Sequence, residues 1–337
     1  MGTAPLHEKY DVALLDLDGV VYLGGTAIPG AAPALQRARA AGMHLAYVTN
    51  NASRTPAAVA ELLRSMDVPA RPADVVTSPQ AAARLLADKL PPGAAVLVIG
   101  SLALRIAVRE RGLRPVSSAA ESPLAVVQGY APGIDYPALA EGALAVRAGA
   151  LFVGTNADST LPGPRGIAPG NGSLLRVIAH ATGAEPVIAG KPELPLHHES
   201  IIRTEARRPL VVGDRLDTDI EAASRAAADS LLVFTGVSRP AELPVAPPEH
   251  RPTYLALTLD ALTEAYPDVT VEDGAATCNG WTARWQSRHG DGGGASIALD
   301  GTGAPIDGLR ALCAAAWSRE GTTAGAVSAA LSRIALS

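Results

Sequence analysis

Four short apolar segments of the chain are each followed by polar residues that could act on a phosphate group. These residues are carboxylates, side-chain amides, a hydroxyl and a lysine. They are Asp16 and Asp18 after VALL, Thr49, Asn50 and Asn51 after LAYV, Lys191 after PVIAG, and Asp214 and Asp219 after PLVVG. Ligands of open parallel sheets bind outside the carboxyl ends of the strands, so we expect these residues to converge.

The residue types suit phosphoryl transfer. A carboxylate such as Asp16 can attack phosphorus and form an acyl phosphate. A second carboxyl group two residues later, Asp18, can protonate the leaving alkoxide and then activate water. Mg²⁺ prefers hard oxygen ligands, which Asp16, the backbone carbonyl of Asp18 and Asp214 would supply. Thr49, backbone amides near Asn50 and the Lys191 ammonium would hold the phosphate oxygens.

The segments that position these residues alternate between strands and helices. Short runs rich in Val, Ile and Leu predict buried strands, and helical stretches of about ten residues separate most of them. The predicted strands are 12–15, 45–48, 95–99, 125–127, 151–153, 186–188, 210–212 and 230–234. The predicted helices include 31–41, 56–66, 103–111 and 217–227, the second starting with Thr55 as N-cap and Pro56 at the first helical position. This alternation is typical of parallel sheets with right-handed crossovers.

Composition limits the classes of function. The 337 residues carry a net charge of −5, which gives no basic surface for nucleic acid. The two cysteines lie far along the chain, so a disulfide framework is not expected. No segment has the length of a signal peptide core or a membrane span, so we expect a cytoplasmic protein without nucleic-acid or membrane partners. Homo-oligomerisation stays open.

The motifs DLDGVVY, VTNN, GKP and GDRLDTD resemble the four motifs of the haloacid dehalogenase superfamily. The resemblance covers roughly residues 11–262. Their order and context are similar to the nitrophenylphosphatase-like subfamily, which has a large α/β cap inserted between the second and third motifs. Together with the C-terminal extension, the chain resembles glycerol-3-phosphate phosphatases of the mycobacterial type, whose appended piece is similar to an incomplete acetyltransferase domain.

This resemblance implies the fold and the domains. The fold is α/β, with a Rossmann-like doubly wound parallel core, an inserted α/β cap and a small α+β C-terminal module. We predict a discontinuous core over 1–80 and 186–265, a cap over 81–185 and the module over 268–337. The stretch Val21–Ile28, with a Gly24-Gly25 turn, is similar to the flap hairpin that follows the nucleophile in this family.

The resemblance also assigns roles to residues. Asp16 would be the nucleophile and Asp18 the general acid/base, while Asp16, Asp18 and Asp214 would bind Mg²⁺. Asp219 would hold Lys191 or a metal-bound water in position without contacting the metal itself. The remaining assignments are Thr49, Asn50, Asn51 and Lys191 to the phosphate or substrate, and Asn156 and Asp158 either to the site near the cap or to a turn.

The predicted activity is Mg²⁺-dependent hydrolysis of a small phosphate monoester through an aspartyl-phosphate. Resemblance favours glycerol 3-phosphate, with phosphoglycolate and pyridoxal phosphate as alternatives. A cap that closes over the core favours a metabolite over a macromolecule. A regulatory member of the fold without activity is a further alternative, which the complete set of Asp16, Asp18, Lys191 and Asp214 disfavours.

Overall fold

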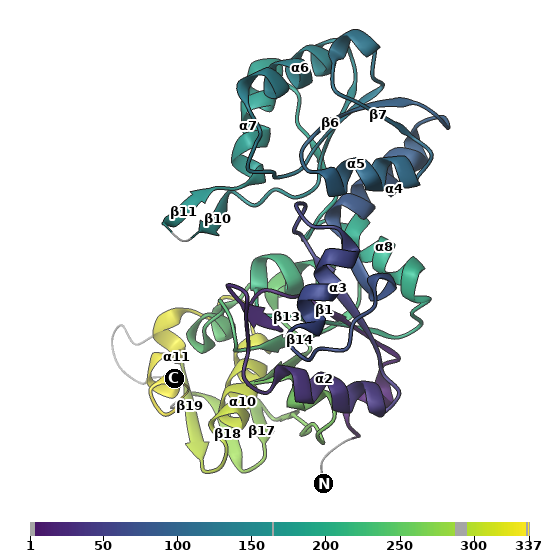
Figure 1. Ribbon diagram of the computed structural model, residues 1–337. Helices are drawn as coiled ribbons and strands as arrows, with labels where there is room; N and C mark the ends of the chain where they lie inside the picture. The colour runs from purple at the N-terminus through teal and green to yellow at the C-terminus, as the bar shows by residue number, and fades with distance from the viewer. Residues whose placement is uncertain (1–3, 164, 287–294, 335, 337) are drawn as a thin grey trace. The chain divides into compact units, whose positions relative to one another are not determined.

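The computed structural model describes residues 4–163, 165–286, 295–334 and 336. The chain forms two compact units (Figure 1). Unit 1 consists of Met1–His44 and Arg208–Ser337, and unit 2 of Leu45–Arg207. These boundaries differ from those of the predicted core and cap, and the predicted domain division stays a prediction.

Unit 1 contains four parallel strands in the order β15-β14-β13-β1. They are β1 (Val12–Leu15), β13 (Pro209–Gly213), β14 (Asp229–Val233) and β15 (Tyr254–Ala256). All four residues of β1 are buried, as expected for a strand covered on both faces. The register places Leu15 opposite Val212, so Asp16 and Asp214 both follow at the carboxyl edge of this sheet. The predicted strands 12–15 and 210–212 are confirmed, and β15 was not predicted.

Short helices surround these strands. They are α1 (Leu6–Lys9), α2 (Ala31–Ala40), α9 (Glu221–Arg225) and the helical turns η3 (Leu216–Ile220), η4 (Pro240–Val245), η5 (Pro248–His250) and η6 (Leu259–Leu262). The predicted helix 31–41 is confirmed. The predicted helix 217–227 is divided into η3, which has π-helical hydrogen bonding, and α9. Single-turn π segments of this kind are frequent at functional sites.

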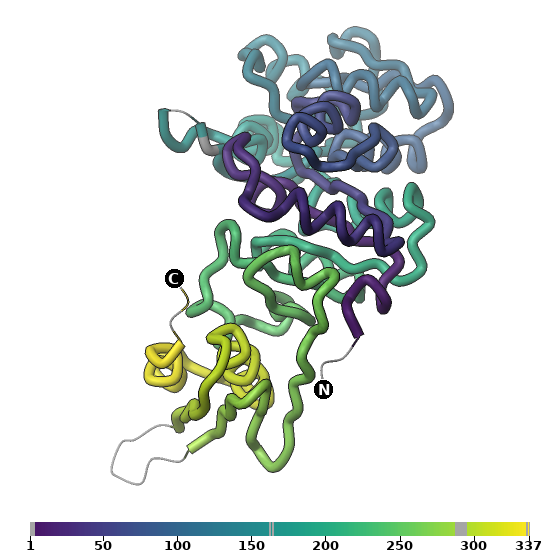
Figure 2. The backbone as a smooth tube through the Cα atoms, turned by 60° about the horizontal axis from the view of Figure 1, so that its bottom comes forward, coloured from purple at the N-terminus to yellow at the C-terminus, as the bar shows by residue number. Residues whose placement is uncertain are grey.

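The C-terminal part of unit 1 has the predicted β-then-α order. An antiparallel sheet runs in the order β16-β17-β18-β19. It comprises β16 (Thr270–Glu272), β17 (Ala275–Cys278), β18 (Trp281–Gln286) and β19 (Ser296–Gly301), followed by α10 (Pro305–Trp317) and α11 (Ala324–Leu331). Trp281 packs on α10 at Gly308, where an added Cβ would lie 3.0 Å from the indole ring. In Figure 2 the strands and helices of this part, coloured from light green to yellow, lie together at one end of the chain trace.

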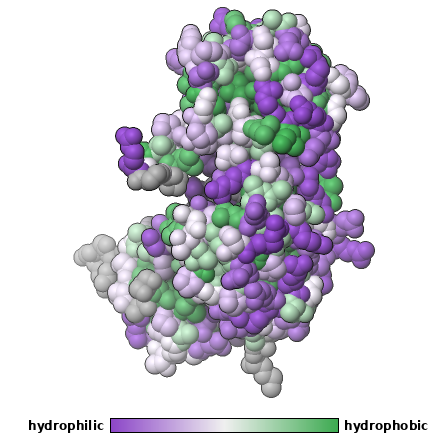
Figure 3. Space-filling view, viewed as in Figure 1, coloured by the Kyte–Doolittle hydropathy of each residue, from purple (hydrophilic) through white to green (hydrophobic). Residues whose placement is uncertain are grey.

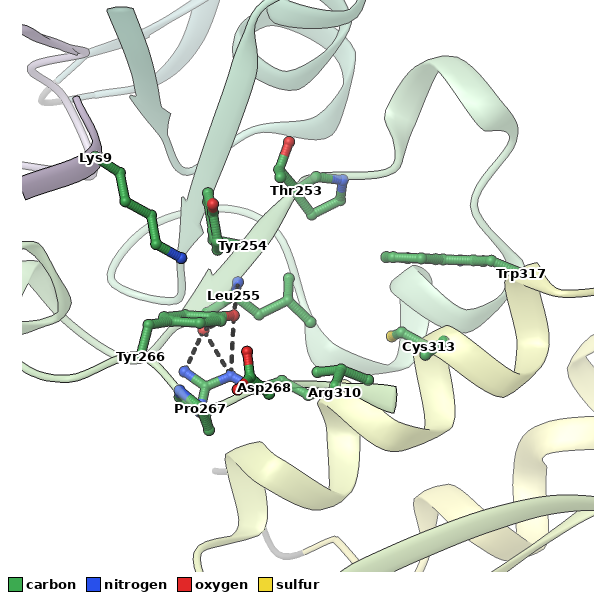
Figure 4. A pocket seen from close by; sticks show the side chains of 13 residues that line it. Lys9, Thr253, Tyr254, Leu255, Tyr266, Pro267, Asp268, Arg310, Cys313 and Trp317 are labelled. Carbon is green, nitrogen blue, oxygen red and sulfur yellow. Dashed lines mark hydrogen bonds between the residues drawn. The ribbon is translucent and has the colours of Figure 1, made fainter. Parts of the chain in front are cut away.

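Arg310 of α10 joins this C-terminal module to the parallel sheet. Its Nε donates to the backbone oxygen of Leu255 in β15 at 3.1 Å and lies 3.0 Å from the hydroxyl of Tyr266 (Figure 4). Its guanidinium stacks 4.4 Å from the centre of the Tyr266 ring and pairs with Asp307 at 2.5 Å. A pocket of about 260 Å³ lies beside these groups, with Trp317 also on its wall. The module therefore docks through buried polar contacts as well as an apolar core.

Unit 2 contains a five-stranded parallel sheet, here called the cap sheet, in the order β12-β9-β8-β6-β7. Its strands are β6 (Ala95–Ile99), β7 (Arg114–Val116), β8 (Ala125–Gln128), β9 (Leu151–Gly154) and β12 (Val187–Ile188). Helices α6 (Tyr136–Arg147) and α7 (Asn171–Thr182) share one apolar cluster with the strands, which includes Ile99, Val126 and Ile178. Figure 1 shows α6 and α7 together on one side of the sheet, away from α4 (Ser78–Lys89) and α5 (Leu102–Glu110).

The rest of unit 2 carries the second and third motifs. Strand β4 (His44–Thr49) pairs in parallel with β5 (Val75–Thr77). Strand β5 was not predicted from the sequence. The other elements are α3 (Pro56–Arg64), the turns η1 (Pro72–Asp74) and η2 (Ala119–Glu121), the hairpin of β10 (Thr160–Gly163) and β11 (Gly166–Pro169), and α8 (Leu194–Thr204). The predicted N-cap of α3 is confirmed, because the Thr55 hydroxyl accepts from the Ala58 amide at 3.3 Å.

One buried carboxylate connects three parts of unit 2. The Glu199 side chain in α8 is fully buried and forms ion pairs with Arg84 in α4, with Arg111 after α5 and with Arg203 in α8. The three arginine side chains are 23–27% exposed. A buried carboxylate is tolerated only when it is paired, so Glu199 depends on this triad of arginines.

No helix in the described part of the chain is both long and apolar enough to cross a membrane. On the face shown in Figure 3, hydrophobic residues form separate patches among hydrophilic ones.

Candidate active site

Three carboxylates of unit 1 form a cluster. One oxygen from each of Asp16, Asp214 and Asp219 lies within 4.8 Å of the others. Asp16 follows β1, Asp214 follows β13, and Asp219 lies in η3. Asp214 and Asp219 are buried, whereas Asp16 is half-buried and can be reached from solvent. The predicted convergence of Asp16 and Asp214 at strand ends is therefore observed within this unit.

Backbone groups hold the Asp214 carboxylate in place. Its Oδ2 accepts from the Val237 amide at 2.7 Å, and the Asp214 backbone oxygen accepts from the Ser238 amide at 3.1 Å. Side chains at Gly19 and Gly236 would collide with this carboxylate, since their Cβ atoms would lie 2.4 Å and 2.0 Å from Oδ2. Glycine is thus required at both positions because the backbone approaches Asp214 so closely.

Asp219 takes its position from the π-helical turn. Its Oδ2 accepts from the Arg215 amide at 3.2 Å, and a Cβ on Gly213 would lie 2.1 Å from the Asp219 Cβ. The turn brings its carboxylate into the cluster with Asp16 and Asp214, a position open to direct metal contact as well as to the predicted supporting role. The neighbouring Asp217 lies outside the cluster, where its exposed carboxylate pairs with Arg215 at 2.8 Å.

The cluster fits a hard divalent cation. Three carboxylates at this spacing offer oxygen donors of the kind that Mg²⁺ prefers, and like charges so close are stabilised by a bound cation. In the described ranges, this is the one group of three or more His, Cys, Asp or Glu side chains close enough to share an ion. The Asp18 carboxylate is not part of this cluster, and the metal contact through the Asp18 backbone oxygen stays a prediction.

Asp18 lies beside the predicted flap. Strands β2 (Tyr22–Leu23) and β3 (Thr26–Ala27) form the expected hairpin, with Gly24 and Gly25 at φ values of 57° and 91°. Desolvation raises the pKa of the Asp18 carboxyl, and a hydrogen bond from the Gly24 backbone partly lowers it again. A carboxyl group with a raised pKa is suited to give up and take back a proton.

The second motif lies in unit 2, at the end of β4. Thr49 is buried, and its hydroxyl accepts from the Asn51 amide at 3.1 Å. The exposed Asn51 side chain accepts from the Ser53 amide at 2.8 Å and so forms a turn. The Asn50 side chain bonds to the backbone of Lys191. These three residues were all predicted to contact phosphate or substrate, and that role stays a prediction.

The third motif is in the same unit. Lys191 is only 8% exposed, and its Nζ lies 3.5 Å from the Val48 backbone oxygen. Asn156 is buried and donates to the Asn50 backbone oxygen at 2.8 Å, while its own Oδ1 accepts from the Asp158 amide at 3.3 Å. The structure therefore brings Asn156 to the second and third motifs. The Asp158 amide closes a turn on the Asn156 side chain, and the role of both residues at the site stays a prediction.

Family models match most of the chain. A model of haloacid dehalogenase-like hydrolases matches residues 13–114, and an HAD-hydrolase-like model matches residues 188–263. The D-glycerol 3-phosphate phosphatase of Mycobacterium tuberculosis is 46% identical over 257 residues, which cover 76% of this chain and 72% of that protein. The chain belongs to the haloacid dehalogenase-like hydrolases. The prediction of a phosphatase of this superfamily is confirmed by these relatives.

Solved structures of haloacid dehalogenase-like hydrolases confirm the fold. A glycerol phosphate phosphatase from Mycobacterium tuberculosis in complex with magnesium superposes with a TM-score of 0.85 at 39% identity, covering 99% of this chain and all of that one. A double mutant of a thermostable NPPase from Geobacillus stearothermophilus gives a TM-score of 0.68 at 35% identity, covering 75% of this chain and 97% of that one. Residues 278–336 match a GCN5-related N-acetyltransferase-like domain model, as the predicted C-terminal module implies.

Sequence reasoning did not assign to the site several residues that contact its predicted members or their neighbours. Gly236 and Val237, which hold Asp214, follow β14 and contain no side-chain functional group that would draw notice. Gln128 ends β8 and Asn171 begins α7; both side chains are buried and lie 3.5 Å apart. The polar residue at the carboxyl end of β8 could have been found with the strand-end rule that identified the other motifs.

Proposed function

We propose that this hydrolase is a Mg²⁺-dependent phosphatase that converts glycerol 3-phosphate into glycerol and phosphate. The observation that supports this most strongly is the cluster of Asp16, Asp214 and Asp219, which combines a solvent-accessible carboxylate with two buried ones. Such a cluster suits a nucleophile beside a metal ion. The 46% identical relative is named a D-glycerol 3-phosphate phosphatase.

The metal site is proposed from the donors of unit 1. The carboxylates of Asp16 and Asp214 and the backbone oxygen of Asp18 would hold Mg²⁺, with Asp219 close enough to bind it directly or through water. When bound, the ion would neutralise charge on the phosphate and on the Asp16 carboxylate, so that two anions can approach each other. The relative crystallised with magnesium supports this choice of ion.

The proposed reaction has two steps. In the first, an Asp16 carboxylate oxygen attacks phosphorus, the bond from phosphorus to the substrate oxygen breaks, and Asp18 gives its proton to the departing glycerol oxygen. In the second, Asp18 takes a proton from water, whose oxygen attacks phosphorus and releases Asp16 and inorganic phosphate. The raised pKa of Asp18 supports its role as the acid of the first step.

Thr49 and Lys191 are proposed to bind the phosphate oxygens. This assignment rests on their positions in the second and third motifs of the family. A hydroxyl and an ammonium group are the donors that stabilise the charge spread over the equatorial oxygens during phosphoryl transfer. The near-complete burial of Lys191 limits its contact with bulk water, which strengthens any charge interaction it makes.

The choice of substrate rests on the extent of likeness. The glycerol phosphate phosphatase structure covers 99% of this chain, including the C-terminal module. A 5′-nucleotidase of Bacillus subtilis is 38% identical over 77% of this chain, and this match already takes up 99% of its own length, so little of that protein is left to match the remainder of this chain. Phosphoglycolate and pyridoxal phosphate remain alternative substrates, and a regulatory protein without activity is the alternative of another class.

Phosphate release from a panel of esters tests the proposal. The panel comprises glycerol 3-phosphate, phosphoglycolate, pyridoxal phosphate, a 5′-nucleotide and a sugar phosphate, each with Mg²⁺ and with EDTA. We expect the highest kcat/KM for glycerol 3-phosphate, no turnover with EDTA and none for Asp16→Asn. Asp217→Asn is a matched control, since that carboxylate is exposed and lies outside the cluster. Turnover by Asp16→Asn would contradict the mechanism. A higher kcat/KM for another ester of the panel would overturn the choice of glycerol 3-phosphate as the substrate.

A further inference from the structure

The side chain of Asn50 holds the backbone of Lys191 on both sides. Asn50 Oδ1 accepts from the Lys191 amide at 2.8 Å, and Asn50 Nδ2 donates to the Lys191 backbone oxygen at 3.1 Å. These two hydrogen bonds resemble the pair of N–H···O bonds that two opposite residues exchange in an antiparallel β-sheet. Both ends of the Asn50 amide are thus engaged by a single residue that is 141 positions away in the sequence.

Asn50 is itself fixed by two donors. Its backbone oxygen accepts from the Ser78 hydroxyl at 2.7 Å and from Asn156 Nδ2 at 2.8 Å. Ser78 and Asn156 are buried at 0% and 4% exposure. Buried hydrogen bonds are costly to leave unmade, so the Asn50 backbone has little freedom to move. The position of Lys191 is therefore tied to that of β4.

Close packing at Gly190 supports the same conclusion. A Cβ at this position would lie 2.5 Å from Asn50 Oδ1, 2.5 Å from the Thr155 backbone oxygen and 3.2 Å from the Asn156 Cβ. The residue before Lys191 is therefore enclosed by the side chain that holds the lysine and by the segment that follows β9. No side chain fits there without displacing one of these groups.

The network continues to the cap sheet. Asn171 Nδ2 donates to the Asn156 backbone oxygen at 2.8 Å and also lies 3.4 Å from the Gln128 backbone oxygen. Gln128 is the last residue of β8, and Asn156 lies just after β9. Amide side chains thus connect two strand ends of the cap sheet to Asn50 and, through it, to Lys191.

We infer that Asn50 is a positioning residue that acts on the reaction through Lys191, and that Asn156 transmits the position of the cap sheet to it. Its side chain does not serve as a direct phosphate ligand. The inference rests on the proposed function, in which the Lys191 ammonium contacts the phosphate. Without the Asn50 side chain, Lys191 would keep its ammonium group but would hold it in a poorer position relative to the phosphate. A displacement of about 1 Å can lower the rate about 100-fold.

A double-mutant cycle on Asn50→Ala and Lys191→Met separates the two roles. We expect Asn50→Ala to lower kcat for p-nitrophenyl phosphate by about 10- to 100-fold in the wild-type background. In the Lys191→Met background it should lower kcat by less than about 3-fold, since a residue that acts only through the lysine has nothing left to position. Losses that multiply in the double variant would show an independent contact with the phosphate and overturn the inference.

Rescue and control variants guard against a folding defect. Asn50→Asp retains an oxygen acceptor for the Lys191 amide, so it should retain more activity than Asn50→Ala. Asn156→Ala should lower kcat in the same direction but less. Ser200→Ala removes a buried hydrogen bond of 2.8 Å within α8 and should leave kcat unchanged. An Asn50→Ala rate no lower than that of Ser200→Ala would also overturn the inference.

Binding of orthovanadate, measured by calorimetry in the same cycle, distinguishes failure of the inference from failure of the proposed function. A wild-type chain that binds vanadate but hydrolyses no ester would refute the proposed activity, while the cycle in vanadate affinity still tests Asn50. We expect the affinity loss caused by Asn50→Ala to disappear in the Lys191→Met background. A wild-type chain that binds no vanadate would refute both.

Discussion

The carboxylate of Asp214 occupies the space that a side chain at Gly236 would need. A Cβ there would lie 2.0 Å from Asp214 Oδ2, and the next residue, Val237, donates its amide to the same oxygen at 2.7 Å. The loop after β14 therefore sets the direction of this carboxylate through its backbone alone. Thr235 anchors the loop, since its hydroxyl donates to the Gly19 backbone oxygen at 2.6 Å.

Gly236→Ala should weaken Mg²⁺ binding by at least about 10-fold, a loss of about 1.4 kcal/mol. The added methyl group would force either the carboxylate or the loop to move. Calorimetric titration with Mg²⁺ measures this without substrate. Gly133→Ala is a suitable control, because no atom beyond its neighbours in the chain lies within 4 Å of its added Cβ. Equal Mg²⁺ affinity in Gly236→Ala and wild type would contradict the role of the loop.

Asp18→Asn should lower kcat for an alkyl phosphate by about 10²- to 10⁴-fold, the usual range for loss of a general acid or base. The loss should be smaller for the first step with p-nitrophenyl phosphate, whose leaving group needs little protonation. Because the pKa of Asp18 is raised, the alkaline limb of kcat/KM in the wild type should lie above the ordinary range of an aspartate. A similar loss for both substrates in a burst-phase measurement would argue against proton donation by Asp18.

The sequence predicted the strand ends better than the contacts made there. Runs such as Ala95–Ile99 are long, β-branched and buried, so their position can be read directly from the pattern. Strand β5 was missed because Val75–Thr77 is only three residues long. The divided helix at η3 was missed because a π turn depends on tertiary contacts, here those of Asp219, and has no periodicity of its own.

The site was predictable as a set of residue types but not as a set of bonds. The motifs assigned Asn50 and Lys191 to one predicted phosphate site, and the structure places the two residues in contact. They could not show that the Asn50 amide pairs with the Lys191 backbone, because that bond joins segments 141 residues apart. Similarly, the sequence around Gly236 does not indicate that the Asp214 side chain approaches it.

Stability should decrease as the pH falls below about 6.5, in part because of His197. Burial lowers the pKa of His197, and the neighbouring His198 lowers it further. The His197 side chain therefore binds a proton more readily in the unfolded chain than in the folded one. The stability that neutral His197 contributes is complete above its unfolded pKa and is lost as the pH falls. His197→Gln should reduce the drop in Tm between pH 7 and pH 5. An unchanged drop would show that other groups account for it.

Both cysteines should be inert in the folded protein. Cys278 and Cys313 are free thiols at 2% and 1% exposure. Burial raises the pKa of Cys278 to about 12 and that of Cys313 still further, which suppresses the reactive thiolate. A colorimetric thiol reagent should label neither at pH 8 and both after denaturation. Rapid labelling of the native chain would indicate that the C-terminal module opens.

The triad around Glu199 makes the tolerance to substitution unequal within one ion-pair cluster. Loss of Arg84, Arg111 or Arg203 leaves the carboxylate with two cations. Loss of the carboxylate leaves three guanidinium groups to repel one another. Single substitutions of the arginines should therefore be tolerated one at a time, whereas Glu199 should be replaced only after the arginines have been. The ion-pair geometry thus determines the order in which these four positions can change during evolution.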